Sequence, residues 1–156
     1  MDKSTFAALL PADAPGALPY WMLFVSGLAV FNSVQNFLTT SLTKRVYSRS
    51  PASVNPLQAR TFAVWTLMSA AVRIYASYNI SSKVIYDLAL VSYALAWLHF
   101  VSEALVFRTA GLAGVISPFI VSCESVVAPQ AFSTKLRASP TSLVWMVKQY
   151  DFYIRV

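Results

Sequence analysis

Three long apolar runs restrict this chain to helical, membrane-type architectures. The runs cover about residues 18–38, 57–78 and 84–107, and helices of that length reach across the hydrocarbon core of a bilayer, which is about 30 Å thick. Charged residues make up only 12% of the 156 residues and hydrophobic residues 57%, whereas about a quarter of a soluble protein is charged. We therefore expect an all-α, polytopic membrane protein that forms a single domain, a small antiparallel bundle of four transmembrane helices.

The fourth apolar run is interrupted. It covers about residues 111–128 and contains Pro118, which would kink a helix, and Glu124. Residues 123–140 resemble a polar loop, and apolar character returns at residues 141–147. Removal of 123–140 would join two apolar pieces into one span of ordinary length. We interpret 123–140 as an inserted loop, and two origins stay open: an insertion in the gene model, such as a retained intron, or a variant with a damaged fourth helix. Residues 141–156 are then a tail or the remainder of the fourth span. Sequencing of the transcript tests which origin is correct.

The net charge of +6 does not indicate nucleic-acid binding. The twelve basic residues stand singly or in short groups between the apolar runs, as in loops near anionic head groups. Residues 1–19 contain no basic segment followed by a hydrophobic core, so we expect no cleaved signal peptide. Basic residues are divided almost evenly between the two sides of a four-span topology, so the orientation stays open.

Each of the three complete runs has one polar stripe when it is drawn as a helix. Such stripes face neighbouring helices, because acyl chains satisfy no polar group. Two interpretations stay open: a bundle held by hydrogen bonds between its helices, and a polar cavity or docking groove. The stripes contain Asn32, Ser33, Asn36 and Thr40 in the first run, Thr66, Ser69, Arg73 and Ser77 in the second, and Ser92, His99 and Glu103 in the third.

His99 and Glu103 are four residues apart inside the third run, and His99 is the only histidine. An ionisable pair in a membrane helix is costly and suggests a functional site. The alternatives are a structural hydrogen bond between the two side chains, extended to Arg73, and a proton relay or metal site. One histidine, one carboxylate and the distant, single Cys123 provide too few ligands for zinc or iron. The chain also lacks a dinucleotide or P-loop motif, so we expect no cofactor and no enzyme activity.

Several motifs resemble one known family. They are Asn55-Pro56-Leu57-Gln58-Ala59-Arg60-Thr61-Phe62, Trp65-Thr66-Leu67 with Arg73, and His99-Phe100-Val101-Ser102-Glu103 followed by Phe107-Arg108-Thr109. In this order they are similar to the ergosterol biosynthetic protein 28 family, over about residues 18–122 and again over 141–153. In similar proteins the segment ending at Ser122 runs directly into the one beginning at Thr141, which is where 123–140 intervenes.

The resemblance implies a non-catalytic scaffold with four spans in the endoplasmic reticulum membrane. Its expected partners are the enzymes of sterol C-4 demethylation: the C-4 methyl oxidase, the decarboxylating C-3 dehydrogenase and the 3-keto reductase, with the sterol methyltransferase close by. Self-association stays open. The alternative is a small transporter or lipid-binding protein with an Arg/His/Glu polar path. The residues expected in helix–helix or partner contacts are Gln58, Arg60, Trp65, Arg73, His99 and Glu103.

Overall fold

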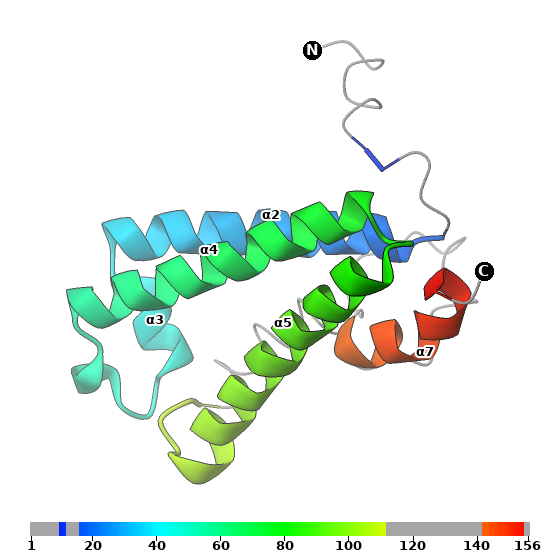
Figure 1. The fold of residues 1–156 in the computed structure, drawn as a ribbon. Coiled ribbons are helices and arrows are strands. Elements are labelled where there is room, and N and C mark those ends of the chain that lie inside the picture. The colour runs from blue at the N-terminus through cyan, green and yellow to red at the C-terminus, as the bar shows by residue number, and fades with distance from the viewer. Residues whose placement is uncertain (1–9, 12–15, 112–141, 155–156) are drawn as a thin grey trace, which may run out of the picture.

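The structure is a computed structural model, and it describes residues 10–11, 16–111 and 142–154. These parts of the chain contain helices and no strand, so the predicted all-α class is confirmed. Figure 1 shows two long helices side by side, a third that diverges from them, and a short C-terminal helix against the third. The elements are α2 (Leu18–Leu38), α3 (Ser41–Val46), the 3₁₀-helix η1 (Pro51–Ser53), α4 (Pro56–Tyr78), α5 (Lys83–Val101), the π-helix η2 (Ser102–Val106) and α7 (Ser142–Ile154).

Two of the described helices are long and apolar enough to cross a membrane. They are α2, with 21 residues, and the continuous stretch Lys83–Val106, with 24 residues. The helix α4 has 23 residues, but it contains Arg60, Arg73 and several hydroxyl side chains and is not among the candidates. The fourth predicted run, 111–128, and the loop 123–140 lie almost wholly outside the described residues.

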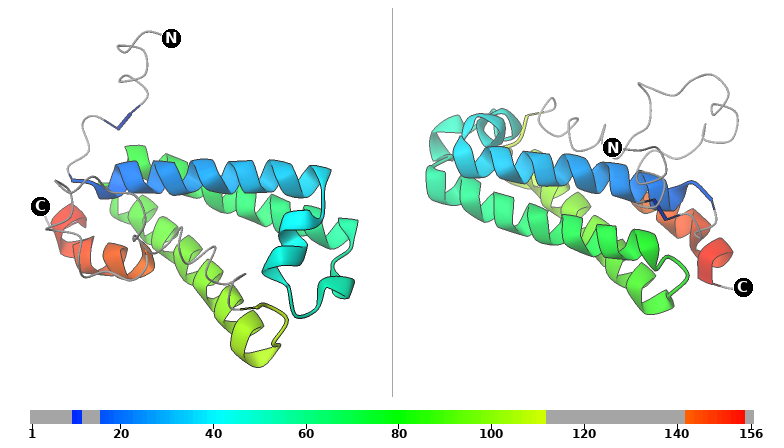
Figure 2. Two further views of the ribbon diagram at one scale, coloured as in Figure 1. Left: turned by 180° about the vertical axis from the view of Figure 1, so that it is seen from behind. Right: turned by 90° about the horizontal axis from the view of Figure 1, so that it is seen from above.

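Small side chains hold α2 and α4 together. Ala59, Ala63 and Ala70 of α4 are fully buried, as is Ser26 of α2, and Ser33 is 1% exposed. Residues four or seven apart lie on the same face of a helix, and small side chains on such a face let two backbones approach closely. The two helices accordingly lie alongside each other over most of their length in both views of Figure 2.

The start of α4 is determined by local sequence. The side chain of Asn55 accepts a hydrogen bond of 2.9 Å from the backbone N–H of Gln58, and Pro56 occupies the first turn. An asparagine cap followed by proline is a typical helix start. At the other end, residues 79–82 form a tight turn between the second and third predicted runs, and α5 begins at Lys83. The α4–α5 hairpin therefore agrees with the predicted run boundaries to within one residue at this turn.

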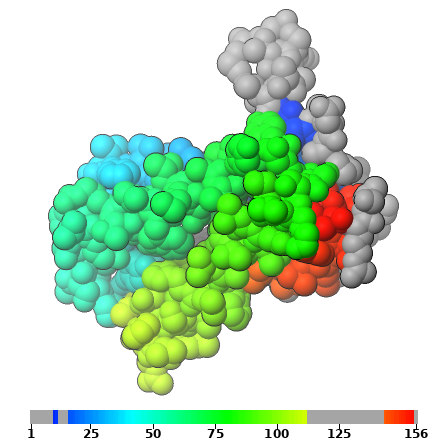
Figure 3. Space-filling model, viewed as in Figure 1, coloured from blue at the N-terminus to red at the C-terminus, as the bar shows by residue number. Residues whose placement is uncertain are grey.

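The C-terminal segment forms a helix that packs against the start of α5. The hydroxyl group of Tyr86 donates a hydrogen bond of 2.6 Å to the backbone carbonyl of Met146. Met146 is fully buried, in one apolar cluster with Leu18 and Met22 of α2 and with Tyr153. Figure 3 shows α7 and the first turns of α5 in contact at the same end of the molecule. Met146 and Tyr153 of α7 thus pack in the same core as α2 and α5.

Candidate functional site

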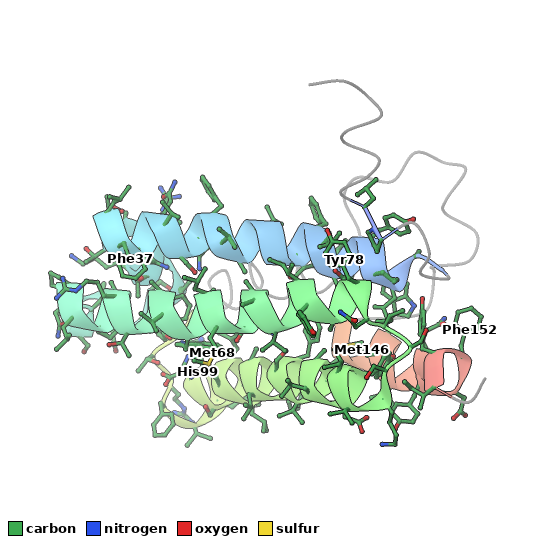
Figure 4. All side chains as sticks on the ribbon, turned by 45° about the horizontal axis from the view of Figure 1, so that its top comes forward. Phe37, Met68, Tyr78, His99, Met146 and Phe152 are labelled. Atoms are coloured by element: carbon green, nitrogen blue, oxygen red, sulfur yellow. The ribbon has the colours of Figure 1, made fainter. Side chains whose placement is uncertain are left out.

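The first polar cluster surrounds His99. Its Nε2 atom lies 2.8 Å from the hydroxyl group of Tyr47, a residue of the loop between α3 and η1. The ring of Trp65 packs edge-on against the imidazole, with 5.5 Å between the ring centroids, and Tyr47 packs in the same way against Phe62. Figure 4 shows His99 on the C-terminal part of α5. The predicted residues Trp65 and His99 are thus brought together, in an aromatic setting.

The predicted hydrogen bond between His99 and Glu103 is absent from the described structure. The α-helix ends at Val101. The next turn is the π-helix η2, in which the backbone N–H of Phe107 donates a hydrogen bond to the carbonyl of Ser102. A π-turn has more residues than an α-turn and changes the direction in which the side chains after it point. The carboxylate of Glu103 instead accepts a hydrogen bond from the hydroxyl group of Thr109. The predicted i, i+4 geometry requires an uninterrupted α-helix, and that is the physical reason for the difference.

The segment after η2 turns back and joins the loop that contains Tyr47. Arg108 has a positive φ of 56°, a left-handed conformation that commonly ends helices. The backbone N–H of Thr109 then donates to the carbonyl of Glu103 over 2.9 Å, and the backbone N–H of Arg49 donates to the carbonyl of Thr109 over 3.1 Å.

The hydroxyl group of Tyr47 stays protonated. Burial and the nearby Glu103 carboxylate raise the pKa of Tyr47, so its hydroxyl keeps the proton that it can donate to His99.

The second polar cluster is built around Arg73 and lies nearer the α4–α5 turn. The guanidinium Nε donates to the hydroxyl group of Ser92 over 3.2 Å, and an Nη atom donates to the Ser92 carbonyl over 3.1 Å. The guanidinium also lies over the ring of Tyr93, 3.9 Å from its centroid, as in a cation–π contact. Arg73 is only 7% exposed. It contacts neither His99 nor Glu103, so the described residues form two separate clusters rather than the expected extension from the pair to Arg73.

The remaining predicted site residues occupy different surroundings. Gln58 is half-buried, and its side-chain oxygen is buried without a hydrogen-bond partner in the described structure. Arg60 is exposed. Among residues 10–11, 16–111 and 142–154, no three His, Cys, Asp or Glu side chains come together in a way that could hold a metal ion.

Sequence reasoning missed two residues of these clusters, Tyr47 and Tyr93. Tyr47 stands in a basic, polar loop, where no helical pattern relates it to His99. Tyr93 follows Ser92 directly but lies off the polar stripe of its helix, because consecutive residues are 100° apart. The only feature of the sequence that could have indicated a role for Tyr47 was an aromatic residue in the loop between two predicted spans.

These observations define a class: a helical protein with membrane-type helices, in which Arg73 and His99 form hydrogen bonds to neighbouring segments. The chain belongs to the Erg28-like family, since the family model described as "Erg28 like protein" matches residues 18–127. The resemblance found in the motifs is thereby confirmed. Ergosterol biosynthetic protein 28 of Candida albicans is 43% identical, over 96% of both chains.

Other relatives extend this result beyond one group of organisms. Ergosterol biosynthetic protein 28 of Schizosaccharomyces pombe is 48% identical over 79% of this chain and 88% of its own length. The human homologue of that protein is 36% identical over 78% of this chain and 89% of its own. No solved structure matches the chain. The family takes part in ergosterol biosynthesis, as the names of its members state, and those names describe no catalytic activity.

Proposed function

We propose that this protein is a non-catalytic membrane scaffold for the enzymes of sterol C-4 demethylation. Membership of the Erg28-like family carries the proposal, because it links the chain to ergosterol biosynthesis. The proposed clients are the C-4 methyl oxidase, the decarboxylating C-3 dehydrogenase and the 3-keto reductase, with the sterol methyltransferase nearby. The physical benefit is a raised effective concentration of consecutive enzymes and retention of poorly soluble intermediates between them.

The described side chains support this role better than catalysis. Tyr47 and His99 bond to each other, Glu103 bonds to Thr109, and Arg73 bonds to Ser92. Nucleophilic and acid–base catalysis require such groups to face a substrate in a fixed arrangement. Here each group already has a partner in a neighbouring helix or loop, as expected of residues that determine helix packing.

The proposed topology has four spans in one domain, within the membrane of the endoplasmic reticulum. Two apolar helices of sufficient length, α2 and Lys83–Val106, support membrane insertion. The helix α4 would be the second span, since it lies between them in the chain and packs along α2. Its polar residues Ser77 and Arg73 are buried against protein, which is how a span with polar groups is tolerated.

Affinity purification and sterol analysis test the scaffold function. The full-length protein would be expressed with a C-terminal tag in baker's yeast whose own relative is deleted. We expect the oxidase, dehydrogenase and reductase to co-purify in mild detergent, and 4-methylsterols to accumulate in the deletion strain and decline on expression of this chain. A tagged membrane protein of similar size from another pathway is the control. Unchanged sterol flux in the deletion strain would contradict the proposal.

A further inference from the structure

Arg73 carries a positive charge close to the middle of the helical hairpin. Its guanidinium binds Ser92, the tenth residue of the stretch Lys83–Val106. At 1.5 Å per residue, Ser92 lies roughly 14 Å from the start of a stretch about 36 Å long. With Lys83–Val106 as a membrane span, as proposed above, the guanidinium lies at the depth of the acyl chains and does not extend to the nearer head groups, although long basic side chains commonly do so.

The contacts of this charge in the described structure are all with neutral groups. The two hydrogen bonds to Ser92 use two of the five N–H groups of a guanidinium. Tyr93 contributes the face of its ring. No carboxylate of the described residues forms an ion pair with Arg73: Asp87 pairs with Lys83, and Glu103 binds Thr109. A buried guanidinium without a counter-ion is expensive, so a negative charge brought to this position would be strongly stabilised.

The surroundings of Arg73 restrict what can bring that charge. The seam between α4 and α5 is defined here by Ser69, Arg73 and Ser92. Ser69 and Ser92 are half-buried rather than buried, so the seam is not fully covered at these two residues. Lipid phosphates remain at the membrane surface, well above this depth. Many exposed side chains of both helices are large and apolar, so the partner must also be compatible with lipid; they include Val64, Leu67, Met68, Leu88, Val91 and Leu95.

We propose that Arg73 pairs with an aspartate or glutamate side chain near the middle of a transmembrane helix of a partner protein, which docks along the α4–α5 seam. Charge complementarity supports this occupant, since ionisable groups inside membranes pair with one another. A guanidinium can bind a carboxylate through two parallel hydrogen bonds, which also determines the register of the incoming helix. This inference rests on the proposed scaffold function, and it adds the chemistry that one client must carry.

Substitution of Arg73 tests the charge. All variants are expressed in the yeast strain described above. Arg73→Met removes the charge but keeps a side chain of similar length, and Arg73→Lys keeps the charge. Arg45→Met is the control, because it makes the same change at an exposed residue of α3. We expect Arg73→Met to lower the recovery of at least one client by roughly tenfold or more, since loss of one member of a buried charge pair costs several kcal/mol. Arg73→Lys should retain part of the recovery, and Arg45→Met all of it. Full recovery with Arg73→Met would overturn the inference.

Photo-cross-linking keeps the test valid if Arg73→Met does not fold, because it uses the natural Arg73. A photoreactive amino acid replaces Ser69 in the seam or, as the matched control, the exposed Ala71 two residues away. We expect Ser69 to give an adduct that maps to a client's transmembrane segment containing Asp or Glu, and Ala71 to give none. An adduct to a segment without an acidic residue would contradict the inference.

A charge exchange distinguishes the possible counter-ions. Arg73→Glu combined with Asp→Arg or Glu→Arg in the cross-linked client helix should restore recovery that Arg73→Glu alone abolishes. Glu124 is the only acidic residue between 112 and 141; if Glu124→Arg restores recovery instead, the counter-ion lies within the chain and the inference is wrong. If the natural protein recovers none of the three enzymes, the scaffold function fails. If it recovers them equally well without Arg73, only this inference fails.

Discussion

The hydroxyl group of Tyr47 and Nε2 of His99 lie 2.8 Å apart, although 52 positions separate the two residues in the chain. The contact joins the loop after α2 to the C-terminal part of α5, and Arg49 and Thr109 add a backbone hydrogen bond between the same two segments. The imidazole thereby gains a partner within the protein, and a histidine buried without one would be costly. His99, which the sequence suggested as part of a functional site, thus takes part in the packing of a loop against a helix.

Removal of the Tyr47 hydroxyl should destabilise this contact specifically. We expect Tyr47→Phe to lower the free energy of unfolding by about 1–3 kcal/mol, because His99 loses its hydrogen bond while the aromatic packing against Phe62 remains. Unfolding by SDS in mixed micelles measures the change. Tyr75→Phe, at an exposed tyrosine of α4, is the control and should change little. Equal effects of the two substitutions would show that the Tyr47–His99 bond contributes nothing.

Enlargement of a small side chain should separate α2 from α4. Ala63 is fully buried, on the same face of α4 as the buried Ala59 and Ala70, so Ala63→Leu should destabilise the protein by roughly 1–3 kcal/mol through overpacking. Ala71→Leu makes the same change at an exposed position of α4 and should have almost no effect. The SDS unfolding midpoint of both variants gives the comparison. A similar midpoint for both would mean that the two helices do not pack through Ala63.

A buried hydrogen bond connects the end of α2 to α3. The hydroxyl group of Thr43 donates to the side-chain oxygen of Asn36 over 2.7 Å, and both residues are almost fully buried. We expect Thr43→Val, which keeps the shape, to cost about 1–3 kcal/mol because the amide oxygen of Asn36 loses its donor. Thr39→Val, at an exposed neighbour, should stay within about 0.5 kcal/mol of the natural protein. Thermal unfolding in detergent distinguishes the two outcomes.

The attachment of α7 should depend on one tyrosine hydroxyl. Tyr86→Phe removes the 2.6 Å hydrogen bond to the Met146 carbonyl and leaves the apolar contacts of the ring in place. We expect faster amide hydrogen exchange across residues 142–154, while exchange in α2 and α4 stays unchanged. Mass spectrometry of the protein in micelles measures both regions. Tyr75→Phe is again the control, and unaltered exchange in α7 would contradict the assigned role of Tyr86.

Substitution of His99 separates the scaffold from the transporter hypothesis. For a scaffold, His99→Ala should weaken stability and client recovery but leave measurable sterol synthesis, since the residue packs against Tyr47 and Trp65. For a transporter with a polar path through His99, the same change should abolish transport. Sterol profiles of the complemented yeast strain provide the readout. Complete loss of function in a variant that still folds and recovers its clients would favour the transporter.

Much of the fold could be predicted because the signals are local. Runs of 21 to 24 apolar residues predict α2, α4 and the Lys83–Val106 stretch with ends close to those observed. Of the residues in the polar stripes, Ser33, Asn36, Arg73 and Ser77 are buried, and the others are half-buried. The π-helix was missed, because the sequence 102–106 is as suitable for an ordinary α-helical turn as for a wider one, and the choice depends on contacts of Glu103 with residues 109 and 110.

The sequence by itself determined that the chain is helical, that it has membrane-type helices, and to which family it belongs, since each depends on composition, period and motifs along the chain. Only the tertiary structure decided which polar groups meet. His99 forms a hydrogen bond with Tyr47 instead of Glu103. Arg73 forms hydrogen bonds with Ser92 instead of the expected His99 and Glu103. The physical reason is that a helical wheel specifies the face of each side chain but not the neighbour it meets, which depends on crossing angles, loop paths and the π-turn.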